Sequence, residues 1–162
     1  MATTSELYEL VRNAWSQVPT PAREDLGMME WMWGKSSALA FMGIAPIDVD
    51  TDSSGFHAST PLMDLPPHAA AAYLGTYILS LLQSLMFQES VGLFDDLVTR
   101  PHTLTCLTNK GFWDRVIQKH LPRNCQQATI EVARHLAEKH QALSLNEEQV
   151  YVLLELAKYL QQ

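Results

Sequence analysis

Charged residues are scarce in this sequence, and most of those present are acidic. Asp, Glu, Lys and Arg make up 18% of the 162 residues, whereas soluble domains usually contain about 25%. The 11 Lys and Arg against 18 Asp and Glu give a formal net charge of −7. Nucleic acids and anionic membranes attract basic surfaces. We therefore expect neither as a main partner, and a basic protein is favoured instead.

Cysteine and glycine are also rare, and their scarcity excludes several kinds of site. Cys106 and Cys125 form no C-x-x-C motif, which argues against a disulfide framework or a zinc cluster. Among the seven glycines there is no G-x-G-x-x-G, P-loop or G-x-S-x-G pattern. The start of the chain lacks the basic and apolar regions of a secretory signal. We expect a cytoplasmic protein without a cofactor.

Hydrophobic residues make up 47% of the chain, which excludes a disordered protein. The length suits a single domain over residues 1–162, because domains usually hold about 100–200 residues. Apolar residues recur mostly at helical spacing, and Thr3 with Glu6 and Ser144 with Glu147 have capping-box spacing. We predict an all-α fold of five to seven helices around a buried central helix.

The central helix is predicted over Leu65–Gln88, which contains no Asp, Glu, Lys or Arg. Its 24 residues are enough to span a bilayer. Polar residues such as His68 and Gln83 interrupt the apolar run, and no basic cluster flanks it. A helix that is apolar on nearly all sides is also typical of a protein core. We favour the buried helix over the membrane span.

Three segments depart from this simple pattern. Ile47–Thr60 alternates apolar and polar residues around a turn rich in Ser and Asp, which indicates a small β-hairpin. A short helix is expected at Val91–Val98, ended by Arg100-Pro101. Asn124 is expected to cap a later helix.

Three motifs follow one another along the chain. They are Val18-Pro19-Thr20-Pro21 after a helix, Leu65-Pro66-Pro67 before Tyr73 and Tyr77, and Leu145-Asn146-Glu147-Glu148-Gln149 before Leu156-Ala157-Lys158-Tyr159-Leu160. In this order they resemble an uncharacterised bacterial family, a domain of unknown function. The chain departs from the family at Asp48–Ser59, where the family has an aromatic-rich run. The resemblance implies a bacterial origin and an intact fold, and it names no site.

Asp48, Asp50 and Asp52 place three carboxylates at alternate positions, as at the start of a calcium loop. An EF-hand needs Gly at the sixth position and a bidentate acid at the twelfth, and this chain has Ser53 and Ser59 there. The EF-hand interpretation therefore fails. An irregular cation site remains as a weaker alternative to a solvent-facing edge.

A second candidate metal site lies on a later helix. Glu131, His135 and Glu138 share one helix flank at i, i+4 and i+7. No H-E-x-x-H motif is present, and Arg134 and Lys139 add positive charge nearby. A solvated helix face is the favoured interpretation, with metal binding as the alternative.

Cys106 follows His102 by four residues, so the pair is a candidate for a cysteine nucleophile with a histidine base. Nucleophilic catalysis also needs an orienting third group and an oxyanion site, and the sequence indicates neither. Free cysteine is commonly buried, so we expect these residues to pack in the core.

Three methionines and two tryptophans fall within the six residues Met28-Met29-Glu30-Trp31-Met32-Trp33. On a helix Met29, Met32 and Trp33 can share a core face, while Met28 and Trp31 point elsewhere. Either the helix is covered on both sides, or part of this surface is exposed. Because Met adapts its shape and Trp is enriched at interface hot spots, an exposed remainder suits a partner or an apolar ligand. Our candidate binding residues are Met28, Trp31, Met32 and Trp33.

These observations favour a non-enzymatic bacterial interaction protein that neutralises a basic partner, as immunity proteins and antitoxins do. The alternatives are a metal-dependent hydrolase-type enzyme, using His135, Glu131 or Asp48–Asp52, and a small apolar-ligand-binding protein.

Overall fold

The computed structural model describes residues 2–92 and 99–162 of the chain. Within those ranges every regular element is helical and no strand occurs, so the predicted all-α fold is confirmed. The elements in chain order are α1 (Thr4–Trp15), η1 (Arg23–Leu26), α2 (Gly27–Trp33), α3 (Lys35–Leu39), η2 (Pro46–Asp48), α4 (Ser54–His57), η3 (Pro61–Met63), α5 (Pro67–Val91), α6 (Thr99–Leu107), α7 (Lys110–Phe112), η4 (Trp113–Gln118), α8 (Arg123–Glu138) and α9 (Glu147–Gln161). The expected number of five to seven helices is not confirmed, because short helices such as α3, α4 and α7 bring the α-helices of the described ranges to nine.

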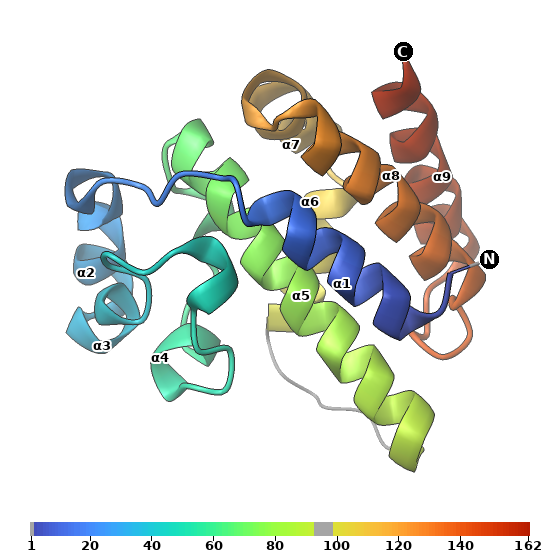
Figure 1. The fold of residues 1–162 in the computed structure, drawn as a ribbon, viewed down its shortest axis with the longest axis horizontal. Coiled ribbons are helices and arrows are strands. Elements are labelled where there is room, and N and C mark those ends of the chain that lie inside the picture. The colour runs from blue at the N-terminus through green and yellow to red at the C-terminus, as the bar shows by residue number, and fades with distance from the viewer. Residues whose placement is uncertain (1, 93–98) are drawn as a thin grey trace.

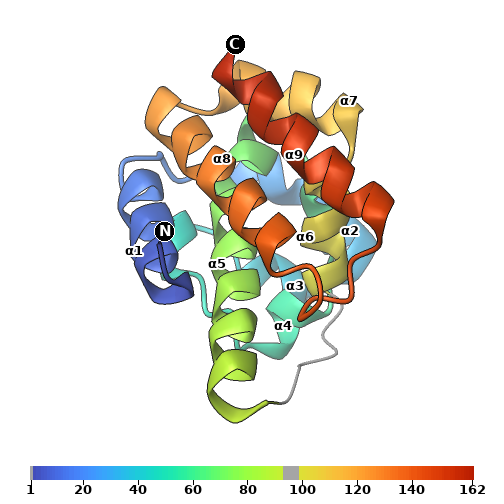
Figure 2. The same ribbon diagram turned by 90° about the vertical axis from the view of Figure 1, so that its right-hand side faces the viewer.

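Helix α5 lies at the centre of the arrangement, as Figures 1 and 2 show from two directions. It contacts α1 and α6 and the short segments η2, η3 and η4. Helix α8 packs against α1, and α9 packs against α8. Helix α3 contacts both α2 and α4, and these three helices lie on the opposite side of α5 from α8 and α9 (Figures 1 and 2).

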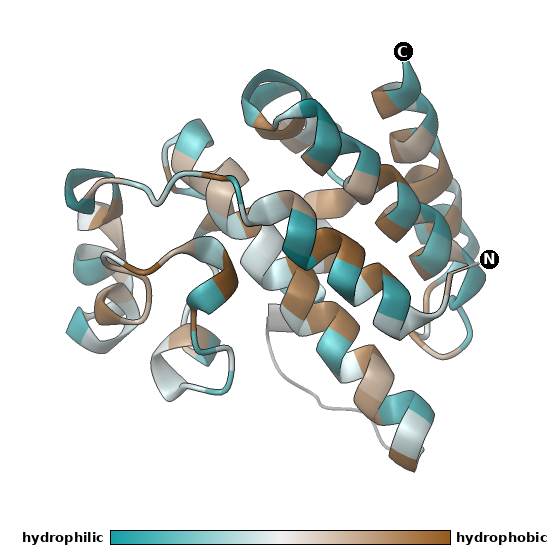
Figure 3. Cartoon of the chain, viewed as in Figure 1, coloured by the Kyte–Doolittle hydropathy of each residue, from teal (hydrophilic) through white to brown (hydrophobic). Residues whose placement is uncertain are grey.

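The burial of α5 follows from its lack of charge. The residues from Ala69 to Leu82 are all buried, and Gln83 is the first exposed side chain after them. By length and composition the helix is apolar enough to cross a membrane, but 78% of its most apolar window is buried inside the protein. Figure 3 shows the contrast with α1 and α8, where hydrophilic and hydrophobic residues alternate. The predicted buried central helix is therefore confirmed.

Trp15 of α1 makes a close contact with α5. Its ring is fully buried, and its indole N–H donates a hydrogen bond to the carbonyl of Ala71 at 3.3 Å. A Cβ on Gly75, one turn further along α5, would lie 2.4 Å from the Trp15 ring. The glycine therefore permits this approach, although glycine is unfavourable inside a helix.

The hairpin predicted for Ile47–Thr60 is wrong. Pro46 begins the 3-10 helix η2, and Ser53 caps α4 by accepting a hydrogen bond from the Phe56 amide at 3.2 Å. Helix α5 also binds this segment, because the hydroxyl of Thr76 donates to the carbonyl of Pro46 at 2.6 Å. Side chains of α5 thus satisfy backbone groups that a partner strand would satisfy in a sheet.

One of the two predicted capping boxes is confirmed. At α1 the Thr3 hydroxyl accepts from the Glu6 amide, and the Glu6 carboxylate accepts from the Thr3 amide. At α9 the cap is Asn146 with Gln149, two residues later than the predicted Ser144 with Glu147. Ser144 has a φ of 55° and belongs to the turn that reverses the chain between α8 and α9.

Three other local predictions fare differently. Pro101 lies in the first turn of α6 and does not end a helix, because the first amides of a helix have no intrahelical partner to lose. The short helix predicted at Val91–Val98 falls largely on residues 93–98, outside the described ranges. Asn124 does not cap α8, which follows Pro122. Its amide donates to the carbonyl of Ala14 at 3.3 Å and so connects α8 to α1.

Candidate functional site

The first candidate site is the outer face of α2, formed by Met28, Trp31 and Met32 and here called the α2 surface. Trp31 is 83% exposed, and Met28 and Met32 are 42% and 43% exposed. The three positions are spaced i, i+3 and i+4, so they share one side of the helix. Single exposed apolar residues are common, but a grouped tryptophan and two methionines form the kind of patch that marks a contact site.

The expected division of α2 into two faces is only partly correct. Met29 is fully buried, and Trp33 packs against the core while partly buried. Met32 was expected to share that core face, yet it is exposed. The helix has seven residues and its main contacts are with η1 and α3, so little of the protein is available to cover a third side chain.

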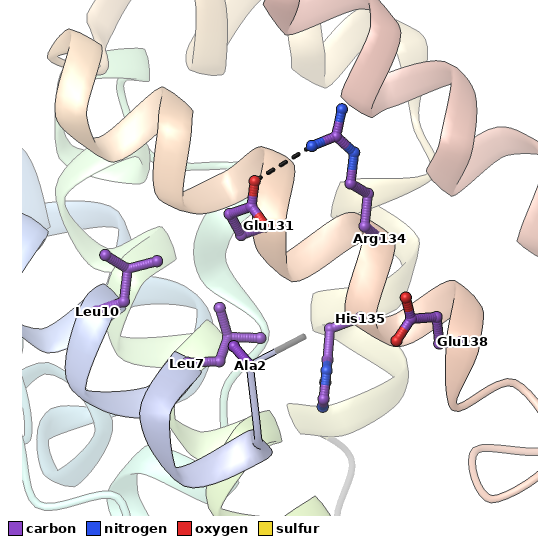
Figure 4. Close-up of a pocket in the computed structure, with 7 residues that line it drawn as sticks. All are labelled: Ala2, Leu7, Leu10, Glu131, Arg134, His135 and Glu138. Atoms are coloured by element: carbon purple, nitrogen blue, oxygen red, sulfur yellow. Dashed lines mark hydrogen bonds and ion pairs between the residues drawn. The ribbon is translucent and has the colours of Figure 1, made fainter.

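The second candidate site is a hollow of about 320 Å³ between α1 and α8, here called the α1–α8 hollow. Its lining residues are Ala2, Leu7, Leu10, Glu131, Arg134, His135 and Glu138. Figure 4 shows the apolar residues of the N-terminal segment and α1 on one side and the polar side chains of α8 on the other. The hollow therefore has one apolar wall and one polar wall.

His135 is buried where three helices meet. Its Nε2 atom lies 2.8 Å from the hydroxyl of Thr4, and this hydroxyl donates to the carboxylate of Glu89 on α5 at 2.7 Å. Lys139 forms an ion pair with the same Glu89 oxygen at 3.6 Å. Burial is the main cause that lowers the pKa of His135, and the charge of Lys139 lowers it further, while the charges of Glu138 and Glu89 raise it by less. The imidazole is accordingly neutral at pH 7.

The predicted metal ligands on α8 have other partners. Glu131 pairs with Arg134 at 3.2 Å, as Figure 4 shows, and His135 is bound to Thr4. Across the described ranges, no group of three or more His, Cys, Asp or Glu side chains is placed to hold a metal ion. Glu131, His135 and Glu138 share one flank of α8 as predicted, and together they line the α1–α8 hollow.

The acidic segment Asp48–Asp52 begins at the last residue of η2 and forms the turn that leads to α4. The Asp50 carboxylate accepts a hydrogen bond from the Asp52 amide at 3.0 Å, and the Asp50 carbonyl accepts from Ser53. The Asp50 carboxylate therefore stabilises the turn. Asp50 and Thr51 also line a shallow polar pocket of about 180 Å³.

Cys106 and His102 are both buried on α6, as the packing interpretation predicts. Burial raises the pKa of the Cys106 thiol to about 12 and lowers the pKa of His102 to about 4. The Nε2 atom of His102 accepts a hydrogen bond from the Leu62 amide at 3.2 Å. A protonated thiol beside an occupied imidazole is unsuited to nucleophilic catalysis, because the thiolate is the reactive form.

A further pocket of about 270 Å³ was not predicted from the sequence. Pro19 and Pro21 of the V-P-x-P motif form part of its wall, together with Ala71 and Ala72 of α5. His68, also in its lining, lies 2.9 Å from the carboxylate of Asp25. The proline motif was the only local indication, and nothing in its residues connects it with α5.

No protein-family model matches the chain, and neither a curated protein nor a solved structure shows significant similarity to it. The resemblance to an uncharacterised bacterial family therefore stays a prediction, and functional inference depends on the chain itself.

Proposed function

We propose that this chain is a non-enzymatic binding module that receives a basic protein partner on the α2 surface, in the manner of an immunity protein or antitoxin. The 83% exposure of Trp31 between two exposed methionines is the observation that supports this most. Tryptophan buries a large area and is enriched among residues that dominate binding energy. Methionine adapts to irregular partner surfaces.

Charge supports a basic partner through its long-range effect. Around the α2 surface the exposed acids Glu24 and Glu30 are nearly balanced by Arg23 and Lys35, so the local charge is small. The whole chain, however, carries a net charge of −7. Such a charge attracts a basic protein from a distance and raises the association rate, while the apolar contact supplies most of the affinity.

The test begins with affinity capture from an extract of the host and continues with the purified captured protein. We expect Trp31→Ala to weaken its binding by at least about tenfold, as loss of a hot-spot residue does. Tyr151→Ala is the matched control, because Tyr151 is an exposed aromatic residue on α9. The proposal fails if no protein is captured at low salt, or if Tyr151→Ala weakens binding as much as Trp31→Ala.

Binding of a small apolar ligand is the second candidate function. The support is the pocket of about 270 Å³, whose lining includes three prolines and three alanines together with Val18 and Leu121. Native mass spectrometry of the purified protein tests this function directly. A mass equal to that of the bare chain in every preparation would contradict it.

A further inference from the structure

The α1–α8 hollow offers a ligand two walls of different chemistry. Leu10 of α1 lines the hollow with a side chain that is 44% exposed, and Leu7 lines it while almost fully buried. Glu131, His135 and Glu138 supply polar atoms from α8. Pockets that hold small molecules combine apolar surface with a few convergent polar groups in this way, at volumes of roughly 300–1,000 Å³.

The hydrogen bonds at Thr4 determine which nitrogen of His135 carries the proton. A threonine hydroxyl has one proton to donate, and that of Thr4 is donated to Glu89. Thr4 must therefore accept from His135, so Nε2 of the neutral imidazole carries the hydrogen. Nδ1 then holds a lone pair, and no residue in the described ranges donates to it.

The charged side chains of the hollow leave one acid without a partner. Arg134 is occupied by Glu131 at 3.2 Å. Glu138 forms no ion pair or hydrogen bond with any residue that the structure describes. The polar wall thus presents a free carboxylate and a hydrogen-bond acceptor, with a net charge of −1 when the imidazole is neutral. Such a wall repels anions and favours a cation that donates hydrogen bonds.

We propose that the α1–α8 hollow is a binding site for a small organic ammonium ion that carries a short apolar group. The ammonium group binds Glu138 and Nδ1 of His135, and the apolar group lies against Leu7 and Leu10. The volume of about 320 Å³ fits a six-carbon chain or a single ring. This site is independent of the α2 surface and of the partner proposed for it.

The probe is n-hexylammonium, titrated by isothermal calorimetry into the full chain, with hexanoate and hexanol as matched anionic and neutral compounds. We expect saturable binding of hexylammonium below about 10 mM, as ordinary ligand efficiency gives for a molecule of this size. Hexanoate and hexanol should bind at least about tenfold more weakly, because each lacks the cationic donor. In proton NMR, hexylammonium should shift the ring C–H resonances of His135.

Two pairs of variants locate the site. Glu138→Gln removes the free carboxylate, and its control is Glu148→Gln at an exposed acid on α9. Leu10→Ser removes part of the apolar wall, and its control is Leu154→Ser, where the leucine is 42% exposed. We expect Glu138→Gln and Leu10→Ser each to weaken hexylammonium binding by at least about fivefold, with both controls unchanged.

Each alternative outcome overturns the proposal. Equal binding of hexylammonium and hexanoate would show that the site does not select a cation. Equal weakening by Glu148→Gln and Glu138→Gln would show general attraction to an acidic chain. Absence of saturable hexylammonium binding would show that the hollow is not a binding site. Because Glu138 is exposed, Glu138→Gln leaves the fold intact for the comparison with Glu148→Gln.

Discussion

Helices α5 and α2 are both apolar and poor in charge, yet the protein buries one and exposes much of the other. Helix α5 has 25 residues and is surrounded by α1, α6 and three short helical segments. Helix α2 has seven residues and contacts mainly η1 and α3. Low charge therefore leads to burial of a helix only when enough of the chain can surround it. Substitutions in the two regions should therefore differ sharply in effect.

The largest effect is expected for Trp15→Ala, at the contact of α1 with α5. Removing a fully buried tryptophan leaves a cavity and deletes the indole hydrogen bond to the Ala71 carbonyl, so the free energy of unfolding should fall by about 3–5 kcal/mol. Urea unfolding followed by circular dichroism measures this change. Should Trp15→Ala not fold at all, Trp15→Phe provides a milder test, and a loss below about 1 kcal/mol from Trp15→Ala would contradict the contact.

Acid should destabilise the region around α5 through His102, whose ring meets that of Tyr77 on α5 with centroids 5.3 Å apart. Burial lowers the pKa of His102 from 6.5 to about 4, while the Asp64 charge raises it slightly. Below pH 6.5 the unfolded chain takes up a proton that the folded chain resists. Stability is therefore full above pH 6.5 and declines toward pH 4, by up to ~3 kcal/mol.

Urea unfolding at a series of pH values measures this decline. His135 contributes in the same direction, because its pKa is also lowered by burial. His102→Gln should remove the larger share of the dependence between pH 6.5 and 4. An unchanged pH profile in His102→Gln would show that another group causes it.

A glycine in each region allows a matched comparison. Gly75→Ala in α5 forces a Cβ against the Trp15 ring at 2.4 Å, which should cost about 2 kcal/mol after the gain in helix propensity. Gly27→Ala in α2 meets no atom within 4 Å and should be neutral or slightly stabilising. Thermal unfolding of the two variants under the same conditions measures both changes in stability. Equal changes in stability from Gly75→Ala and Gly27→Ala would contradict the difference between α5 and α2.

The smallest effect on stability is expected for Trp31→Ala on the α2 surface. Because the side chain is 83% exposed, the free energy of unfolding should change by less than about 0.5 kcal/mol. The same variant should remove the tryptophan fluorescence that acrylamide quenches most readily. A stability loss comparable to that of Trp15→Ala would mean that Trp31 belongs to the core and not to a binding surface.

Local sequence patterns predicted part of the fold correctly. Thr3 and Glu6 cap α1 because their interaction involves only neighbouring backbone groups. Asn146 with Gln149 has the same spacing as Ser144 with Glu147, and the turn after α8 decides between the two. Spacing alone cannot decide which of the two pairs caps α9, because the position of the cap depends on where α8 ends and how the chain turns after it.

The candidate sites show the same limit. The flank shared by Glu131, His135 and Glu138 follows from helix geometry and was predicted. Thr4, which fixes the tautomer of His135, lies 131 residues away in sequence. A pattern along the chain contains no information about that pairing, because it arises only when α1 packs against α8.

Spacing and charge are local properties, so the sequence was sufficient to predict that the protein is helical and that an uncharged helix lies at its centre. The packing of the folded chain was needed to show that Met28 and Trp31 are left uncovered, and that Met32 is exposed although its spacing placed it on the core face with Met29. The physical reason is that burial depends on neighbours, and those of a seven-residue helix are supplied by distant parts of the chain. The same reason explains why a neutral histidine, a free acid and two leucines form one hollow between the first helix and the eighth.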